Sequence, residues 1–521
     1  MAACTTLAAC QKDRPKPQWD LDVLAPLIQT SLTIGDLVPD TMLATDGSGQ
    51  VSILHTFELF SLSLDTVLTA PDTSFRYAYA LPFPGPIQFQ PGVTFDASDE
   101  VTRFDLDDLQ LSKLIVRSGQ VDVAITNMMN GHIIGDFALP GAQLEGEPFQ
   151  VLMALPPGTP AAPSNTTSSR PLNGYVFDMR GPALNQVNSL ATHLSYSNAP
   201  NGSTISITNM DSLLATVSYH GIVPEYALGY FGMRTIQVEP ATTRLDLFEN
   251  VSGTLDLDQV DATVKIRNGL GVDAKATIHH IRSLNTRTGT EVPLIASFTN
   301  NPVNIDRAAD MGSTFSPSVK NIALDQGNSN IKQFLENLPD QIGYALDVTI
   351  NPMGNISNGH DFLYHDSRVT AELEVNIPLR LSATGLSLRK VMEVDLPGTA
   401  DAHAWQYGTM HLFAQNGFPF SAAIELAVVA PDGQSISVLA PGGTIPSATL
   451  GANGLVTEMA DGRLDFRINS AQMNLLHLSG KVQVTAVFNT AEQPQHVQLL
   501  DSYRMDLKLT LDGNYVVNGD E

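Results

Sequence analysis

Alternation of apolar and polar residues dominates the chain. Between Val369 and Leu381 every odd position is apolar, whereas most even positions, such as Thr370 and Glu372, are polar. A period of two is typical of a strand with one face on a core and the other in water. Similar stretches occupy residues 264–267, 422–429, 464–468 and 503–511. We therefore expect antiparallel sheet over most of the chain, with 369–381 as one strand whose odd residues are buried.

Helical periodicity is confined to two short segments. Four apolar residues at positions i, i+3, i+4 and i+7 predict a helix over 329–338, with Asn328 or Ser329 as its cap and Pro339 as its stop: Ile331, Phe334, Leu335 and Leu338. A second, weaker pattern over Gly181–Leu194 places Pro182 in a first turn but includes Asn185 and Asn188, which form helices poorly. One or two short helices in 521 residues predict a mainly β protein.

A weak internal repeat suggests that one sheet unit is used more than once. Residues 118–123 (SGQVDV) resemble 479–484 (SGKVQV), and 259–264 (QVDATV) is a degenerate third copy. Each copy is followed by an asparagine: Asn127, Asn489 and Asn268. The pattern predicts tandem antiparallel β-sandwich-like domains. It also resembles the sandwiches of the plant desiccation-protein family and the tubular lipid-binding domains, at the level of the fold alone.

The predicted division of the chain is linear. Residues 156–172 are rich in Pro, Ser and Thr, have no periodicity and are predicted to be a linker or long loop. The full division is a signal and tether (1–18), an N-terminal β domain (19–155), the linker (156–172), a second β domain (173–299), a β region with the helix 329–338 (300–395) and a C-terminal β domain (396–521).

The N-terminal segment carries a lipidation motif. Leu7-Ala8-Ala9-Cys10 matches the bacterial lipobox, and a polar, Pro-bearing stretch follows it as a tether would. Six residues precede Leu7, fewer than the apolar stretch of about 7–15 residues in a full signal. Either translation starts further upstream or the match is accidental. The expected outcome is acylation at Cys10 and attachment to a membrane.

The segment after Cys10 resembles a known family. Gln11-Lys12-Asp13 is similar to the surface-export signal of Bacteroidota lipoproteins, and Trp19-Asp20 and Ile350-Asn351-Pro352 are similar to stretches of large lipoproteins of that phylum. The resemblance covers most of the chain by spacing more than by identity. It implies an outer-membrane, surface-exposed lipoprotein. That group has no settled activity, so the resemblance implies no catalytic residue.

The charge and cysteine content of the chain exclude some classes of partner and cross-link. The chain has 28 Lys and Arg against 54 Asp and Glu, a net charge of −26, and no basic run longer than a pair. Nucleic acid is therefore not an expected partner, because phosphate binding needs clustered cations. The two cysteines, Cys4 and Cys10, leave the rest of the chain without thiols, which excludes a disulfide framework there.

Three groups of side chains are candidates for a metal or ligand site. Two acidic clusters are weak Ca²⁺ candidates, because Ca²⁺ takes six to eight oxygen ligands: Asp105, Asp107 and Asp108, and Asp256, Asp258 and Asp261. The histidines lack the spacing of a zinc site. A row of aromatics at spacing two could bind a ligand but is more often the core face of a strand: Phe75, Tyr77 and Tyr79.

The sequence thus favours a lipid-anchored envelope protein with a binding or structural role. Motifs for a nucleophile, a phosphate loop or zinc are missing from the sequence, so neither catalysis nor a cofactor is expected. The expected partners are the membrane, through the anchor, and an envelope protein, glycan or lipid. Two alternatives stay open: a carrier of apolar ligands with a β-walled groove, and a surface polysaccharide hydrolase with paired carboxylates.

Overall fold

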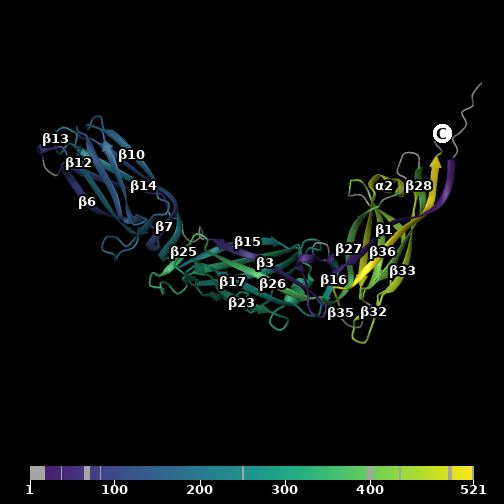
Figure 1. Cartoon of the computed structure of the whole chain (residues 1–521). Coiled ribbons are helices and arrows are strands. Elements are labelled where there is room, and N and C mark those ends of the chain that lie inside the picture. Colours follow the sequence, from purple (N-terminus) through teal and green to yellow (C-terminus); the bar gives the residue numbers. More distant parts are fainter. Residues whose placement is uncertain are drawn as a thin grey trace, which may run out of the picture.

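A computed structural model describes residues 18–36, 38–63, 71–81, 84–248, 251–394, 396, 403–432, 436–490 and 496–518. Strands account for 65% of the structure and helices for 5%, which confirms the mainly β prediction. Three β-sandwiches follow one another along an elongated molecule (Figure 1). We call them the tip domain (71–230), the middle domain (43–63 and 234–378) and the base domain (18–33 and 380–518).

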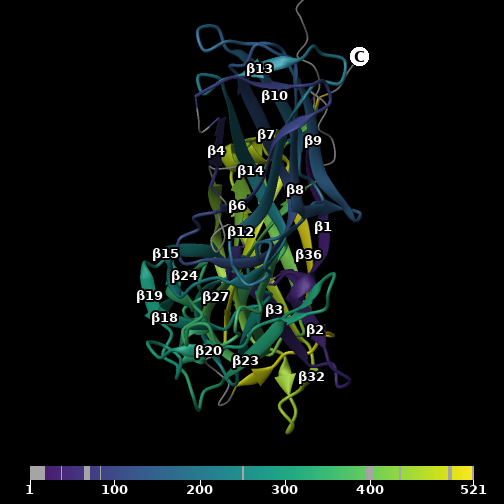
Figure 2. The same cartoon turned by 90° about the vertical axis from the view of Figure 1, so that its left-hand side faces the viewer.

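The tip domain pairs two four-stranded antiparallel sheets. One sheet has the order β4-β14-β7-β10, and the other has the order β6-β12-β8-β9. Viewed from the tip end of the molecule, β4, β14 and β7 lie beside β6, β12 and β8 (Figure 2). The bounds are β4 (Thr73–Ala80), β5 (Ile87–Phe89), β6 (Thr94–Arg103), β7 (Gln110–Asn127), β8 (Ile133–Leu144), β9 (Glu147–Leu155), β10 (Ser164–Pro171), β11 (Val176–Asp178), β12 (Ser189–Asn198), β13 (Ile205–Ile207) and β14 (Ser212–Tyr230).

The middle domain repeats this strand order. Its sheets are β3-β26-β17-β23, extended by β2, and β15-β24-β18, with β19 and β20 both pairing β18. The bounds are β2 (Leu43–Thr45), β3 (Val51–Ser63), β15 (Arg234–Arg244), β17 (Asp261–Asn268), β18 (Ala274–Asn285), β19 (Thr290–Pro293), β20 (Val303–Ile305), β21 (Ala309–Asp310), β22 (Phe315–Ser316), β23 (Ser318–Leu324), α1 (Ile331–Glu336), β24 (Gln341–Ile350), β25 (Asp361–Tyr364) and β26 (Arg368–Pro378).

The base domain repeats the order again, as β1-β36-β28-β33 and β27-β34-β29-β30. The bounds are β1 (Gln18–Thr33), β27 (Arg380–Glu393), β28 (His403–Asn416), β29 (Ser421–Val429), β30 (Ile436–Ile445), β31 (Thr449–Leu450), β32 (Val456–Glu458), β33 (Ala460–Ile468), α2 (Ser470–Ser479), β34 (Lys481–Asn489), β35 (Val497–Gln498) and β36 (Arg504–Asn518). In each domain the first strand pairs the eighth, and the third pairs the eighth and sixth.

The three domains are nested. β1 pairs β36 over its whole length, so the two ends of the described chain meet in the base domain, where β1 and β36 run together in Figure 1. The middle domain is inserted after β1, and the tip domain is inserted after β3. The linear division predicted from the sequence therefore does not describe the sheets, because periodicity gives no information on long-range pairing.

One buried asparagine marks the same turn in every domain. The side chain of Asn127 accepts from the amide of Met129 and donates to the carbonyls of Gly131 and Pro156. Asn268 and Asn416, at the ends of β17 and β28, make the corresponding three bonds, and all three are fully buried. The predicted repeat is correct for Asn127 and Asn268, but the third copy is Asn416 and not Asn489.

Short helices close one end of two domains. In the middle domain α1 buries Ile331, Phe334 and Leu335, and it ends before Leu338, whose φ of 48° is left-handed. In the base domain α2 begins at a capping box, in which Asn469 accepts from the amide of Gln472. The first helix was predicted, although six residues long rather than ten; the second was missed.

Three sequence predictions are corrected by the strands. Residues 164–171 of the predicted linker form β10, an edge strand whose side chains alternate between half-buried and exposed from Ser164 to Ser169. The weaker helix, 181–194, is instead a loop followed by β12. The stretch 369–381 has its odd residues buried as predicted, yet it divides at Leu379 into β26 and β27, which belong to different domains. Alternation continues across that boundary and conceals it.

Candidate functional site

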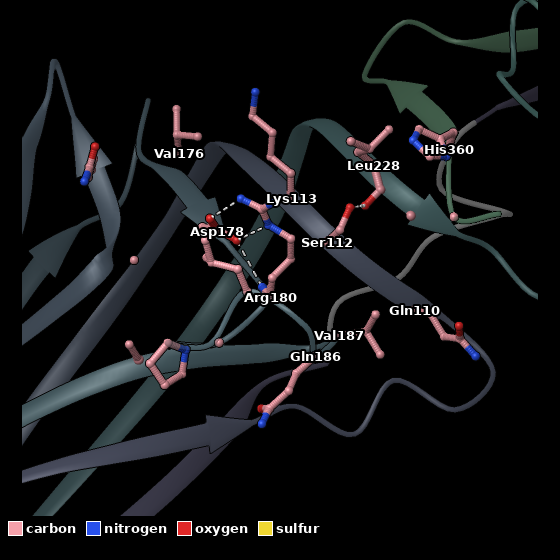
Figure 3. Close-up of a pocket in the computed structure, with 18 of the residues that line it drawn as sticks. Gln110, Ser112, Lys113, Val176, Asp178, Arg180, Gln186, Val187, Leu228 and His360 are labelled. Carbon is pink, nitrogen blue, oxygen red and sulfur yellow. Dashed lines mark hydrogen bonds and ion pairs between the residues drawn. The ribbon is translucent and has the colours of Figure 1, made fainter. Parts of the chain in front are cut away.

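The described residues include a hollow of about 950 Å³ where the tip domain meets the middle domain. Its wall is made by the start of β7, the end of β8, strand β11, the loop 180–187 and Leu228-Gly229 of β14. Residues 358–360 of the middle domain complete it (Figure 3). Positions at the ends of strands and on loops, held by a rigid sandwich, are where binding sites commonly lie.

Strand β11 sets which side chains face the hollow. It pairs β7 through Val176–Asp178 and β8 through Val176 and Phe177, so it bridges the two sheets. Alternation places Phe177 in the core, 2% exposed, and turns Val176 and Asp178 toward the hollow. In the middle domain the corresponding connection, between the sixth and seventh strands, contains helix α1.

The loop after β11 is held in an uncommon backbone conformation. Gly181, Leu184 and Asn188 have φ values of 68°, 57° and 52°. The amide side chain of Asn188 fixes the loop, because it accepts from the N–H of Leu111 and donates to the carbonyl of Leu109. A left-handed φ is rare for leucine, and Leu184 is also 57% exposed. Both features position an apolar side chain at the rim of the hollow.

Two cations lie in the hollow. Arg180 donates from Nε and a terminal nitrogen to the two carboxylate oxygens of Asp178, at 2.9 and 2.7 Å, and these bonds lower the pKa of Asp178. Lys113 lies with its ammonium 5.7 Å from the centre of the Tyr226 ring, and within the part of the chain that the structure describes it forms no ion pair. Figure 3 shows Lys113 on β7 and Arg180 in the loop that follows β11.

The amides of the hollow complete its polar lining. Gln110, Gln143 and Gln186 come from β7, β8 and the loop, and Oε1 of Gln186 is buried without a hydrogen-bond partner. A buried acceptor without a partner costs free energy, about 1–3 kcal/mol, unless a ligand or water donates to it. Together with Lys113 and Arg180, these groups can bind an anionic group and hydroxyls beside it.

The junction between the two domains lies next to the hollow and contains a network of tyrosines and carboxylates. Strand β25 of the middle domain adds to β14 of the tip domain from Asp361 to Tyr364. Tyr226 and Tyr364 each donate to one oxygen of Asp310 at 2.8 Å. Burial and this carboxylate raise the pKa of Tyr364 to about 12. Asp361, 1% exposed, accepts from Asn351 at 2.7 Å and from Arg307 at 3.3 Å.

The predicted aromatic candidates lie elsewhere, on the core face of β4 in the tip domain. Phe75, Tyr77 and Tyr79 on β4 are half-buried and face the core. The Tyr77 hydroxyl lies 2.6 Å from the Thr102 hydroxyl, and the Tyr79 ring is 5.6 Å from that of Phe95. This is the packing of a strand's core face, which the sequence favoured as the alternative to ligand binding.

The predicted acidic clusters form no group of three or more metal-ligating side chains within the described residues. Asp105, Asp107 and Asp108 are exposed in the turn between β6 and β7. Asp256 pairs with Lys332 and His496, Asp258 pairs with His496 and Arg380, and Asp261 accepts from Gln259. The second cluster therefore contributes ion pairs between the middle and base domains, joined where β16 (Ser252–Leu257) pairs β27.

Sequence reasoning missed the hollow. Asp178 and Arg180 are spaced by two, which is a signal for side chains on one face of a strand, but β11 is only three residues long. Lys113 and Gln110 lie about 70 residues earlier in the chain, so only the fold brings them together. Cys10 and the tether lie outside the described residues. Among the described helices none is long and apolar enough to cross a membrane.

Comparison with known proteins gives little further information. No family model matches the chain, and no curated protein matches it. Among solved structures, the chain is similar to a crystal structure of a protein from Parabacteroides distasonis described as a "putative secreted protein". The match has 13% identity and a TM-score of 0.27, and covers 55% of this chain and 89% of the other.

Proposed function

We propose that the protein is a lipid-anchored cell-envelope protein that holds a binding site away from the membrane. The observation that carries the proposal is the position of the two ends of the molecule. The pairing of Gln18 with Asn518 puts the start of the described chain at the free end of the base domain. The tip domain lies at the other end of the molecule (Figure 1). An acyl anchor at Cys10 would thus attach the base and leave the tip farthest from the lipid.

The junctions between domains support a projecting role. Each junction consists of two chain connections and a strand contributed by the neighbouring domain: β25 on β14, and β16 on β27. Ion pairs of Asp256 and Asp258 add to the second junction. Connections of this kind restrict bending more than a single linker would, because several segments must move together.

Binding without catalysis is the role that the chemistry of the hollow favours. The carboxylate of Asp178 is occupied by Arg180, which lowers its pKa and makes it a poor proton donor or base near neutrality. The remaining groups are cations, amides and the exposed apolar rim of Val176, Leu184 and Val187. We infer a ligand that combines an anionic group with hydroxyls, as in an acidic glycan.

The test of the anchor is cell fractionation. The protein expressed from its own gene in its host should be found with the membranes, and should incorporate a labelled fatty acid. Cys10→Ala should release it to the soluble fraction and abolish the label, whereas Cys4→Ala should change neither. Wild-type protein found wholly in the soluble fraction would contradict the proposal.

The test of the ligand uses the purified full chain. Isothermal titration with trigalacturonic acid should give heat that neutral maltotriose does not. Lys113→Gln should weaken the interaction about tenfold, equivalent to about 1.4 kcal/mol. Lys320→Gln, on an exposed strand of the middle domain, is the matched control. Equal binding of the two sugars, or no effect of Lys113→Gln, would contradict an anion site in the hollow.

A further inference from the structure

The free end of the base domain exposes several large apolar side chains. Trp19 and Leu21 of β1 and Leu478 of α2 are 52%, 47% and 74% exposed. We call these three residues the terminal patch. Exposed apolar side chains are ordinary when scattered, but a group of them at one place marks an interaction surface.

Contacts place the members of the patch at one end. Leu21 pairs Tyr515 across β1 and β36, and the Tyr515 ring is 5.2 Å from that of Trp405. The carbonyl of Trp405 lies 3.4 Å from Nε2 of His477, the neighbour of Leu478. After a bulge, Tyr407 pairs Asn514 in the row of Asp22, so it lies on the opposite face of the sheet and outside the patch. Figure 1 shows α2 and the start of β28 close to the end of β36.

The patch residues of β1 lie on the same side of the strand as residues that are buried in the core. Trp19, Leu21, Val23 and Ala25 alternate along the same side of β1, and their exposure falls from 52% at Trp19 to 4% at Ala25. A strand that ended with its core would carry polar residues at these positions. The acidic residues Asp20 and Asp22 lie on the other side of β1. The exposed residues on the patch side of β1 are therefore Trp19 and Leu21, neither of which is charged.

We infer that the terminal patch rests on the lipid bilayer, in its interfacial layer. Trp favours this layer because its ring is apolar and its N–H is polar, and leucine adds buried area. The inference rests on the proposed anchor. Eight residue steps separate Cys10 from Gln18, and each spans at most about 3.6 Å, so the tether keeps the patch within about 30 Å of the acyl chains.

The tether also explains why a small patch is sufficient. Binding of the patch becomes an intramolecular step with a high effective concentration, so three side chains need supply only modest affinity. The adjacent Asp20 and Asp22 disfavour attraction to anionic lipid. The partner is therefore a zwitterionic lipid surface, and contact should persist at high salt because apolar burial is not screened by ions.

The experiment measures whether Trp19 enters the bilayer when the protein is tethered to it through Cys10. The full chain with Cys4→Ser keeps Cys10 as its one thiol, which is coupled to a maleimide lipid in phosphatidylcholine vesicles. The chain has two tryptophans, and Trp405 is 1% exposed, so quenching by lipids brominated on their acyl chains reports on Trp19. We expect about half of the Trp19 emission to be lost, at both 0.1 and 1 M NaCl. The Trp19→Phe variant measures the contribution of Trp405.

Matched variants separate insertion from proximity. The double variant Leu21→Ser/Leu478→Ser, coupled in the same way, should lose most of the quenching. Met210→Ser, 73% exposed in the tip domain, should leave it unchanged. Trp19 emission that is quenched by iodide but not by brominated lipid would overturn the inference. So would association of the uncoupled chain into dimers that Leu21→Ser/Leu478→Ser abolishes, because a second copy would then cover the patch.

The coupling makes this result independent of natural lipidation. If fractionation shows that Cys10 is not acylated while Trp19 still enters the bilayer, the anchor fails and the patch stands. If Cys10 is acylated but brominated lipids leave Trp19 unaffected, the anchor stands and the patch fails.

Discussion

The tip and middle domains have the same strand order but differ in the connection between their sixth and seventh strands. Between the sixth and seventh strands the middle domain has α1, which buries Phe334 completely and closes the end of its sandwich. The tip domain has β11, which buries Phe177 and turns Asp178 and Arg180 to a hollow. The comparison teaches that the sandwich is a constant frame. The chemistry of these two copies depends on a connection of 17 residues in the tip domain and 16 in the middle domain.

Replacing the buried phenylalanine of either connection should have the largest effect on stability. Phe177→Ala and Phe334→Ala each delete a buried ring, which costs about 3–5 kcal/mol of unfolding free energy. If the domains are separate sandwiches, hydrogen exchange should accelerate in β7 for the first variant and in β18 for the second. Equal acceleration in both domains for either variant would show that they unfold as one unit.

Replacing the turn asparagines should have the second largest effect on stability. Asn127→Ala removes three hydrogen bonds from a buried turn, although the Pro156 carbonyl keeps its bond from Ser164, and should destabilise the tip domain by about 2–4 kcal/mol. Asn268→Ala should do the same to the middle domain. Asn165→Ala, on the exposed edge strand β10, serves as the control and should change stability by less than about 0.5 kcal/mol. Denaturant unfolding of each variant measures the difference.

The sequence predicted the local structure far better than the pairing. Alternation identified the strands, and the spacing of Ile331, Phe334 and Leu335 identified α1, because both depend on neighbouring residues. The pairing of β1 with β36 joins residues almost 500 positions apart. No local pattern contains that information, so nesting could not be derived.

The hollow escaped prediction for a related reason. Lys113 and Arg180 each look like an ordinary exposed cation in the sequence, and only β11 brings them together. Asp256 and Asp258 are weak Ca²⁺ candidates in the sequence, and their partners Lys332 and His496, which lie 76 to 240 residues from Asp256, could not be foreseen. The tyrosine pair on Asp310 gave no signal, because Tyr226, Asp310 and Tyr364 come from three distant segments.

The junction between tip and middle domains should respond to pH at both extremes. Although desolvation opposes it, hydrogen bonds from the Gly312 amide, Tyr364 and Tyr226 lower the pKa of Asp310. A lowered carboxyl pKa stabilises the fold above its unfolded value of 3.8, and this contribution is lost as the pH falls below it. Tyr364 has its pKa raised from 10 to about 12, so its contribution is lost as the pH rises through that range.

The measurement is hydrogen exchange of β25 between pH 3 and 11, corrected for the intrinsic rate. Protection should be constant from about pH 5 to 9 and fall outside it. Asp310→Asn should remove the acid-side change, while Asp366→Asn, nearby and outside the pair, should not. An unchanged profile in Asp310→Asn would show that the tyrosine pair does not hold the junction.

The cations of the hollow should have the smallest effect on stability. Arg180 and Asp178 form an exposed pair, and such pairs contribute about 0–1 kcal/mol. Lys113→Gln and Arg180→Gln should therefore leave thermal unfolding nearly unchanged while they weaken the binding of acidic ligands. A large loss of stability in either variant would mean that these residues hold the fold together and would remove the support for a binding role.

The orientation of the molecule on the cell tests the account most directly. Met210, between β13 and β14, is 73% exposed at the far end of the tip domain, and the described chain contains no cysteine. A Met210→Cys variant should react with a membrane-impermeant maleimide on intact cells as fast as after lysis, and Cys10→Ala in the same chain should remove the labelled protein from the cells. Labelling of Met210→Cys only after the envelope has been opened would contradict a surface lipoprotein whose tip points outward.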